Sequence, residues 1–334
     1  MIWQKTKLHL HPGFEHQADP FLSTSSLVNR TFIMTHASSR IAGVRSVALS
    51  VPDLQATADF FTKIWGLELT DNQGGIQYFK GTGSDAYLIS LRQSQGPAKL
   101  IDVTLRARSL QAIQDIQQHL GEHGKVISPT APVSEPGGGV ACTISDKVGR
   151  IYKLVFADVQ HPASSDQKDR PIRLAHVVLN SDEIAITQKF YEDVFDFSLS
   201  DRTKIMAFMR CNSDHHSIAF GDTDNNALNH IAFLVPDLDS VMRGGGRLKD
   251  AGFPIAWGPG RHGPGNNTFN YFVGPNDIVV EYTSEVEQID DNYVARFPSD
   301  WTWPPGRIDQ WGISPMPHPT LKEAQKKVFF ETPT

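Results

Sequence analysis

The tetrapeptide V-P-D-L occurs at Val51–Leu54 and again at Val235–Leu238. Each copy follows a short run of apolar residues and precedes a segment in which apolar residues recur every three or four positions. This change of period predicts a strand that leads into a helix at both places. The repeated strand–helix junction indicates that one structural unit occurs more than once in the chain.

Four copies of a β-α-β-β-β unit can be placed outward from these two junctions. Aligning Phe60-Phe61 with Phe190-Tyr191 superposes corresponding parts of the two halves of the chain, 130 residues apart. The expected strands are 44–51, 75–80, 86–92, 99–106, 139–144, 150–157, 173–179, 204–211, 217–221, 229–235 and 278–282. The expected helices are 54–65, 109–123, 183–195 and 238–251. The predicted fold is therefore an α+β protein made of four βαβββ modules.

The composition of the connecting segments divides the chain further. The expected order is a loose extension at 1–40, a first domain at 41–160, a linker at 161–170, a second domain at 171–285 and a strap or lid segment at 286–334. The linker is polar throughout. The extension lacks the continuous apolar core of a signal peptide. Met34 is an alternative start of the protein. The last segment, with W-T-W-P-P-G-R at 301–307, is expected over a pocket mouth, over a neighbouring subunit or along the surface.

Composition and charge argue against several classes of protein. With 40% hydrophobic and 20% charged residues, the 334-residue chain resembles an ordinary globular protein. Its net charge of −6 and pI near 6.1, without runs of lysine or arginine, argue against nucleic acid and anionic membranes as partners. No apolar stretch approaches the roughly 18 residues that span a bilayer, and two cysteines cannot form a disulfide framework. We therefore expect a cytoplasmic protein.

Two histidines occupy equivalent places in the third and fourth units. His176 lies in L-A-H-V-V-L and His230 in N-H-I-A-F-L, each on the strand that opens its unit. Glu281 closes the apolar run of the last strand, where a buried carboxylate is costly unless it is paired or binds a metal. A single histidine in an apolar strand is more often a packed core residue. Two histidines and a carboxylate on three strands, however, match the facial-triad ligand set of non-haem Fe(II).

The first domain provides an internal comparison. The positions equivalent to the three candidate ligands hold Ser46, Asp102 and Lys153. A serine, a single carboxylate and a lysine do not form an iron site, because they offer neither imidazole nor a second anionic ligand. We therefore expect one metal ion per chain, in the second domain, and a first domain without metal ligands.

Three longer motifs extend this pattern. They are C-N-S-D-H-H-S-I-A-F at Cys211–Phe220, N-H-I-A-F-L-V-P-D at Asn229–Asp237, and the run from G-P-G-R-H-G-P-G-N-N at Gly258–Asn267 through to Glu281. Together they resemble the type I extradiol ring-cleaving dioxygenases of the vicinal oxygen chelate superfamily, over residues 41–285. The metal ligands that the resemblance implies are His176, His230 and Glu281, and the catalytic residues that it implies are His216, Tyr271 and His262.

The resemblance also implies a reaction and a cofactor. It implies two domains that are each an open mixed-sheet barrel around a central cavity, with Fe(II), or alternatively Mn(II), as cofactor. The expected activity is extradiol cleavage of a substituted catechol by O2, giving a ring-opened semialdehyde or keto acid in the catabolism of aromatic compounds. The expected assembly is a homo-oligomer, from a dimer to a tetramer or larger. Two alternatives remain: a metal-dependent glyoxalase-like isomerase or epimerase, and a metal-free protein of this superfamily that binds a small molecule.

The chain departs from the family pattern at two places. The turn before the glutamate is Gly274-Pro275-Asn276-Asp277, in which glycine and the acid are exchanged, and Asn and Asp tolerate left-handed backbone geometry. Trp257 stands where an arginine is expected in enzymes that act on acidic catechols, which argues against an acidic substrate, although Arg261 or Arg210 could replace it. Trp257 and Arg261 are the tentative pocket residues. His215 is expected to pack away from the metal, because adjacent strand residues face opposite sides.

Overall fold

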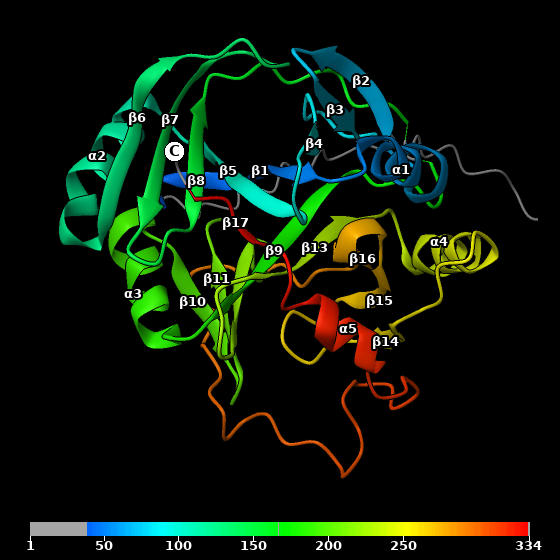
Figure 1. The fold of residues 1–334 in the computed structure, drawn as a ribbon. Coiled ribbons are helices and arrows are strands. Elements are labelled where there is room, and N and C mark those ends of the chain that lie inside the picture. The colour runs from blue at the N-terminus through cyan, green and yellow to red at the C-terminus, as the bar shows by residue number, and fades with distance from the viewer. Residues whose placement is uncertain (1–38, 166, 333–334) are drawn as a thin grey trace, which may run out of the picture. The chain divides into compact units, whose positions relative to one another are not determined.

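The computed structural model describes residues 39–165 and 167–332, which form two mixed β-sheets with helices on their outer faces (Figure 1). The first sheet contains β1 (Ile41–Val51), β2 (Glu68–Gln73), β3 (Ile76–Lys80), β4 (Ile89–Gln93), β5 (Lys99–Ala107), β6 (Gly124–Pro132), β7 (Val140–Asp146) and β8 (Ile151–Phe156). The second contains β9 (Arg173–Ser181), β10 (Ser198–Arg202), β11 (Met206–Arg210), β12 (Ile218–Asp222), β13 (Leu228–Leu234), β14 (Trp257–Arg261), β15 (Thr268–Val273) and β16 (Val279–Ser284).

The strand order of the second sheet repeats that of the first. The orders are β2-β3-β4-β1-β5-β8-β7-β6 and β10-β11-β12-β9-β13-β16-β15-β14, so each strand has a counterpart eight strands later. The predicted α+β fold with an internal repeat is therefore confirmed. Both orders end at unjoined edge strands, so hydrogen bonds between the described strands leave each sheet open. No helix in the described part of the chain is long and apolar enough to cross a membrane.

The aspartate of V-P-D-L explains why the tetrapeptide is repeated. Asp53 is the N-cap of α1 (Leu54–Asp59), and its side chain accepts a hydrogen bond from the backbone N–H of Ala56. Asp237 caps α4 (Leu238–Asp250) in the same way through the N–H of Ser240. An acidic N-cap satisfies one of the free N–H groups in the first turn of a helix. The repeat therefore marks two of the helices that begin directly after a central strand.

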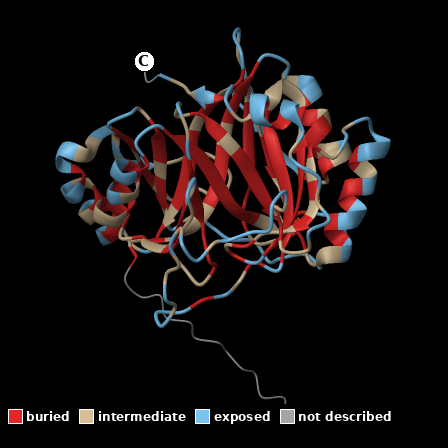
Figure 2. Cartoon of the chain, turned by 90° about the horizontal axis from the view of Figure 1, so that it is seen from below, coloured by how far each residue is buried: buried red, intermediate tan, exposed pale blue. Residues whose placement is uncertain are grey.

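The remaining helices follow the predicted units, with shifted ends. They are α2 (Leu110–Leu120), α3 (Ile184–Phe195) and a π-helical continuation of α1 at Phe60–Trp65, labelled η1. Figure 2 shows that these helices keep exposed outer faces, whereas the strands between them are buried. Gly66 ends η1 in the left-handed region, with φ of 92°, as expected for a glycine that closes a helix.

The strands that were not anticipated from the sequence include β2, β6, β10 and β14. Each is the first strand after the helix of its module, and each lies at an edge of its sheet. In β2 every residue is exposed or half-exposed, so no alternation of apolar and polar residues marks it as a strand. The edge position therefore explains why periodicity did not reveal these strands.

The C-terminal residues return to the first sheet. Residues 286–318, which we call the strap, lead from β16 to α5 (Pro319–Ala324), and β17 (Phe329–Phe330) then pairs in parallel with β5 at Lys99 and Leu100. The C-terminal helix ends at Ala324, and the two phenylalanines of β17 continue the first sheet. The predicted extension at 1–40 lies outside the described residues except for 39 and 40, and the domain boundaries at 160 and 170 stay predictions.

Candidate metal centre

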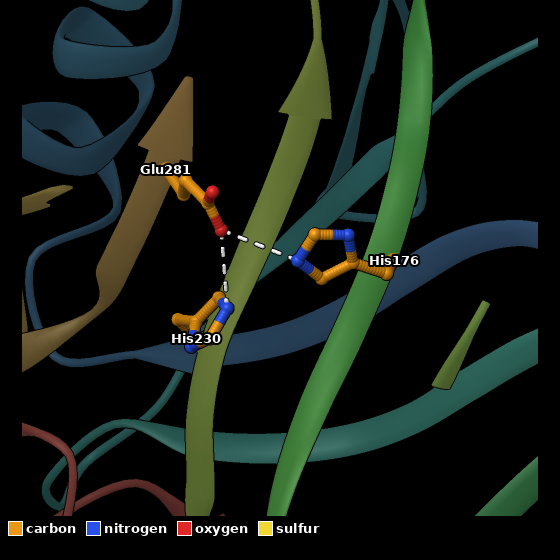
Figure 3. Close-up of side chains that lie close together, drawn as sticks. All are labelled: His176, His230 and Glu281. Carbon is orange, nitrogen blue, oxygen red and sulfur yellow. Dashed lines mark hydrogen bonds and ion pairs between the residues drawn. The ribbon is translucent and has the colours of Figure 1, made fainter. Parts of the chain in front are cut away.

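His176, His230 and Glu281 meet on three adjacent strands of the second sheet. Figure 3 shows the two imidazole rings and the carboxylate directed toward one point from β9, β13 and β16. Strand register explains the meeting, because His176 and Glu281 both pair with Ala232, on either side of β13. Glu281 Oε2 lies 3.2 Å from Nε2 of His176 and 3.2 Å from Nε2 of His230. One potential ligand atom from each residue lies within 4.8 Å of the others, and all three residues are buried.

The donor atoms of these three residues fit a divalent metal. His230 Nε2 and Glu281 Oε1 are buried and have no hydrogen-bond partner among the described residues. Burial raises the pKa of Glu281, but its contacts with His176 and His230 outweigh burial and hold that pKa well below its usual range. Burial lowers the pKa of His230, which favours the neutral imidazole that binds metals. Two imidazole nitrogens and one carboxylate match a facial triad for Fe(II) or Mn(II).

A hydrogen-bond network orients His230. Its Nδ1 lies 2.8 Å from Oδ1 of Asn229, which can only accept, so Nδ1 carries the proton and Nε2 keeps its lone pair for a metal. The same oxygen accepts from Nε2 of Gln325, just beyond α5, at 2.8 Å. Asn229 in turn donates to Oδ1 of Asn180 at 2.8 Å. These amides were not anticipated from the sequence, since Gln325 is 96 residues from its partner.

Asn229→Ala is expected to lower metal affinity about 10- to 100-fold, the usual cost of removing the partner that orients a ligating histidine. Without the Asn229 oxygen, His230 no longer has a fixed tautomer. Metal affinity can be measured by titrating metal-free protein against a chromophoric chelator. Asn72→Ala, on the exposed edge strand β2, is the matched control. Equal affinity of the two variants would contradict this role for Asn229.

A cavity of about 660 Å³ opens onto two of the three candidate ligands, His176 and His230. His216, His262 and Tyr271 line it together with His176 and His230. His262 Nε2 lies 3.0 Å from the Tyr271 hydroxyl and 3.7 Å from Glu281 Oε1. Burial, and then the nearby Glu281, raises the pKa of Tyr271 well above its usual value, so the phenol keeps its proton. The structure thus brings all six predicted site residues together.

The two tentative pocket residues differ in position. Trp257 lines the cavity and stacks on Tyr271, its partner across β14 and β15, with ring centroids 5.1 Å apart. Arg261 lies outside the lining residues, where it pairs with Glu285 and lies over the ring of Trp311 at 5.0 Å. Arg210 also lies outside the lining and donates to Ser200 Oγ at 3.2 Å.

The strap forms one wall of the same cavity. Its lining residues are Trp301, Trp303, Ile308, Met316 and Pro317. A Cβ at Gly263, next to His262, would lie 2.5 Å from the Trp303 ring and 3.0 Å from that of Trp301. Only glycine therefore lets the two indoles approach the His262 loop this closely. The C-terminal segment thus contributes these residues to the cavity wall.

The first sheet has polar residues but no ligand set at the equivalent positions. Ser46 and Lys153 both pair with Thr104, the same register that His176 and Glu281 share with Ala232. Lys153 forms an ion pair with Glu135, and Asp102 accepts a hydrogen bond from Thr104 at 2.8 Å. Within residues 39–165 and 167–332, His176, His230 and Glu281 form the one cluster with metal-ligand geometry.

Comparisons with known proteins agree with this architecture. Residues 43–149 and 173–282 match the model of the family described as Glyoxalase/Bleomycin resistance protein/Dioxygenase superfamily. Metapyrocatechase 2 of Cupriavidus necator is 32% identical over 306 residues, which cover 79% of this chain and 87% of the relative. The crystal structure of the Mn(II)-bound glyoxalase from Novosphingobium aromaticivorans is similar with a TM-score of 0.79 and 33% identity, over 85% of this chain and 94% of that one. An extradiol ring-cleaving dioxygenase from B. fuscum has the same fold, with a TM-score of 0.72 and 18% identity over 82% and 80% of the two chains.

Proposed function

The chain belongs to the Glyoxalase/Bleomycin resistance protein/Dioxygenase superfamily, and from this premise we propose that it is an extradiol ring-cleaving dioxygenase of catechol-type substrates. One observation carries the proposal. The buried ligand set of His176, His230 and Glu281 shares one aromatic-walled cavity with the polar residues His216, His262 and Tyr271. This combination provides three protein ligands, and the polar groups lie where a chelated substrate would meet them.

The ligand set would hold Fe(II), or alternatively Mn(II), and leave several coordination positions open. When bound, such a metal brings a catechol and O2 together, lowers the pKa of a coordinated phenol and lets electron density pass from ring to oxygen. His176 and His230 would be neutral and Glu281 anionic, so the three ligands together supply one negative charge. The similar glyoxalase from Novosphingobium aromaticivorans binds Mn(II), which supports Mn(II) as one of these two metals.

The remaining residues would act on the substrate directly. Tyr271, kept protonated by burial, would donate a hydrogen bond to a substrate oxygen, and His262 would orient the Tyr271 hydroxyl from 3.0 Å away. His216 would exchange protons with the reacting groups on the opposite side of the cavity. Trp257 would orient the aromatic ring of the substrate through its stack with Tyr271.

The cavity walls favour a catechol with an apolar substituent. Phe208, Trp301 and Leu321 line the interior, and the exposed side chains of Ile205 and Met316 lie at the mouth. Among the described residues that line the cavity there is no arginine, and the two lysines, Lys204 and Lys322, are exposed. A carboxylate on the substrate would therefore lose its hydration without gaining a buried cation.

Catechols with alkyl or aryl substituents are expected to be cleaved at least about 10-fold more efficiently, in kcat/KM, than matched catechols bearing a carboxylate. Each additional CH2 that is buried should add about 0.8 kcal/mol, or roughly fourfold. Trp303→Ala should weaken this preference, whereas Trp311→Ala, outside the cavity lining, should leave it unchanged. A preference for the acidic substrates would contradict this assignment of the cavity walls.

Oxygen consumption tests the proposed reaction. Protein purified without oxygen, with its metal content determined, is mixed with a catechol anaerobically and then exposed to O2. We expect oxygen uptake and a yellow ring-opened product. No uptake with a panel of monocyclic, bicyclic and trihydroxylated catechols would overturn the proposal.

A metal-dependent glyoxalase or isomerase is the second candidate, and the 33% identity to the Mn(II)-bound glyoxalase favours it specifically. Such an enzyme would convert its substrate without consuming O2. Turnover of a glutathione hemithioacetal under anaerobic conditions, with no oxygen uptake from any catechol, would support this candidate. Homo-oligomeric assembly stays a prediction that the mass of the protein in solution will test.

A further inference from the structure

Three buried side chains continue the cavity wall away from the candidate metal ligands. His216 lines the cavity, and its Nδ1 lies 3.1 Å from Nδ1 of His215. His215 Nε2 lies 2.8 Å from Oδ2 of Asp201 on β10. His215 and Asp201 are fully buried and His216 nearly so. The three residues therefore form a hydrogen-bonded series that begins in the cavity and ends at a carboxylate.

The carboxylate fixes the proton on His215. Burial raises the pKa of Asp201, but hydrogen bonds from His215 and Arg296 outweigh burial and hold that pKa below its usual value. An ionised carboxylate only accepts, so His215 donates through Nε2–H. The groups packed around His215 are Asp201, His216, the rings of Phe208 and Tyr293, and the backbone of Glu287.

Asp201 has a cationic partner besides His215. The Arg296 guanidinium already faces Asp201, with Nη2 at 3.0 Å from Oδ2, and so balances the negative charge of the carboxylate. A positive charge on the fully buried His215 ring would be costly to desolvate, because the carboxylate that it contacts is already paired with Arg296. A neutral His215 that donates through Nε2 has a lone pair on Nδ1. His216 must then be the donor in the contact between the two rings.

We propose that Asp201 and His215 are positioning residues which place the proton of His216 on Nδ1 and leave its Nε2 as a hydrogen-bond acceptor toward the cavity. The role of this arrangement in catalysis rests on the proposed dioxygenase function. His216 then enters the reaction as a base. It must take a proton from the substrate before it can return one, because its cavity-facing nitrogen carries none at the start.

The strap holds the carboxylate end of the series. The Tyr293 hydroxyl lies 3.1 Å from Asp201 Oδ2, and the Arg296 backbone N–H donates to Oδ1 at 2.9 Å. Backbone pairing between Arg202 N–H and the Arg296 carbonyl, at 2.8 Å, fixes this part of the strap against β10. The segment that supplies two indoles to the cavity therefore also fixes the residue that orders the two histidines.

The tautomers can be read directly. In Zn(II)-loaded protein, ¹⁵N chemical shifts of the imidazole rings distinguish a nitrogen that bears hydrogen from one that does not. We expect Nδ1–H on His216 and Nε2–H on His215 in the unaltered protein, with signals assigned by their loss in His216→Gln and His215→Gln. If the unaltered protein instead carries Nε2–H on His216, that result alone overturns the proposal, and no variant of Asp201 is needed.

Asp201→Asn provides the matched kinetic test. An asparagine of the same shape can donate to His215 Nε2, which reverses both hydrogen bonds and puts the His216 proton on Nε2. We expect exchanged tautomers and a kcat lowered at least about 10-fold, and by no more than the roughly 10²–10⁴ that a positioned acid or base contributes in total. The KM for the catechol and the metal content should not change. Asp250→Asn, at an exposed site on α4, is the control.

The outcomes separate this inference from the proposed function. Exchanged tautomers with unchanged kcat would overturn the positioning role. A parallel change in KM, metal content and kcat would show a structural role only and would also overturn it. If the unaltered protein shows the expected tautomers but cleaves no catechol, the dioxygenase proposal fails and the tautomer assignment stands.

Discussion

Glu281→Gln is expected to leave the protein folded but unable to retain its metal ion. Glutamine keeps the size of the side chain while it removes the one negative charge from a ligand set that otherwise contains two neutral imidazoles. The loss of affinity should exceed the roughly 10- to 100-fold typical of replacing a residue that only orients a ligand. Metal content should therefore fall from one ion per chain toward none, and catechol cleavage should fall with it.

The internal repeat supplies the control for this variant. Lys153 occupies in the first sheet the position that Glu281 occupies in the second. Lys153 pairs with Thr104 of β5, as Glu281 pairs with Ala232 of β13. Lys153→Gln should leave both metal content and oxygen uptake unchanged. The metal can be measured by mass spectrometry after dialysis without oxygen. Full metal retention by Glu281→Gln would refute the ligand assignment.

Trp65→Ala is expected to lower the free energy of unfolding by about 3–5 kcal/mol, the range for removing a large buried aromatic side chain. Trp65 is fully buried and stacks on Tyr282 of the second sheet, with ring centroids 3.7 Å apart. It also makes an edge contact with Phe233 at 5.3 Å. The indole therefore joins residues of both halves of the chain and lies next to the strand that carries Glu281.

Urea denaturation followed by circular dichroism measures this loss. Trp303→Ala, where the indole is 38% exposed, should cost less than about 1 kcal/mol and serves as the control for removing a tryptophan. Because Tyr282 directly follows Glu281, Trp65→Ala should also weaken metal binding. Unaltered stability of Trp65→Ala would show that the two halves are not held together by this contact.

The candidate ligands could be predicted because the chain contains its own comparison. Periodicity alone leaves a histidine in a buried strand ambiguous, since β9 is buried along almost its whole length. The equivalence of His176 and His230 in repeated units, and the lysine at the position equivalent to Glu281, removed that ambiguity. The exchanged turn was also anticipated in physical terms: Asn276 and Asp277 have φ of 59° and 62°, in the left-handed region that these two residues tolerate.

The residues that orient the ligands could not be predicted in this way. Asn229 meets Gln325, and His215 meets Asp201, through contacts between segments that share no sequence period. His215 was expected to pack away from the metal, and it does lie outside the cavity lining, but nothing in the sequence identified its carboxylate partner. Such contacts depend on which segments the fold brings side by side, which local patterns do not encode.

The contact between Gln325 and Asn229 affects when, during synthesis of the chain, the metal can bind stably. Ribosomes synthesise the strands that carry His176, His230 and Glu281 well before Gln325, whose amide completes the hydrogen bonding around His230. A nascent chain therefore has all three ligands before it has the amide that holds Asn229, the residue that orients His230. Stable metal loading should accordingly follow translation of the helix after the strap, and chains arrested before residue 325 should bind metal weakly even though every ligand is present.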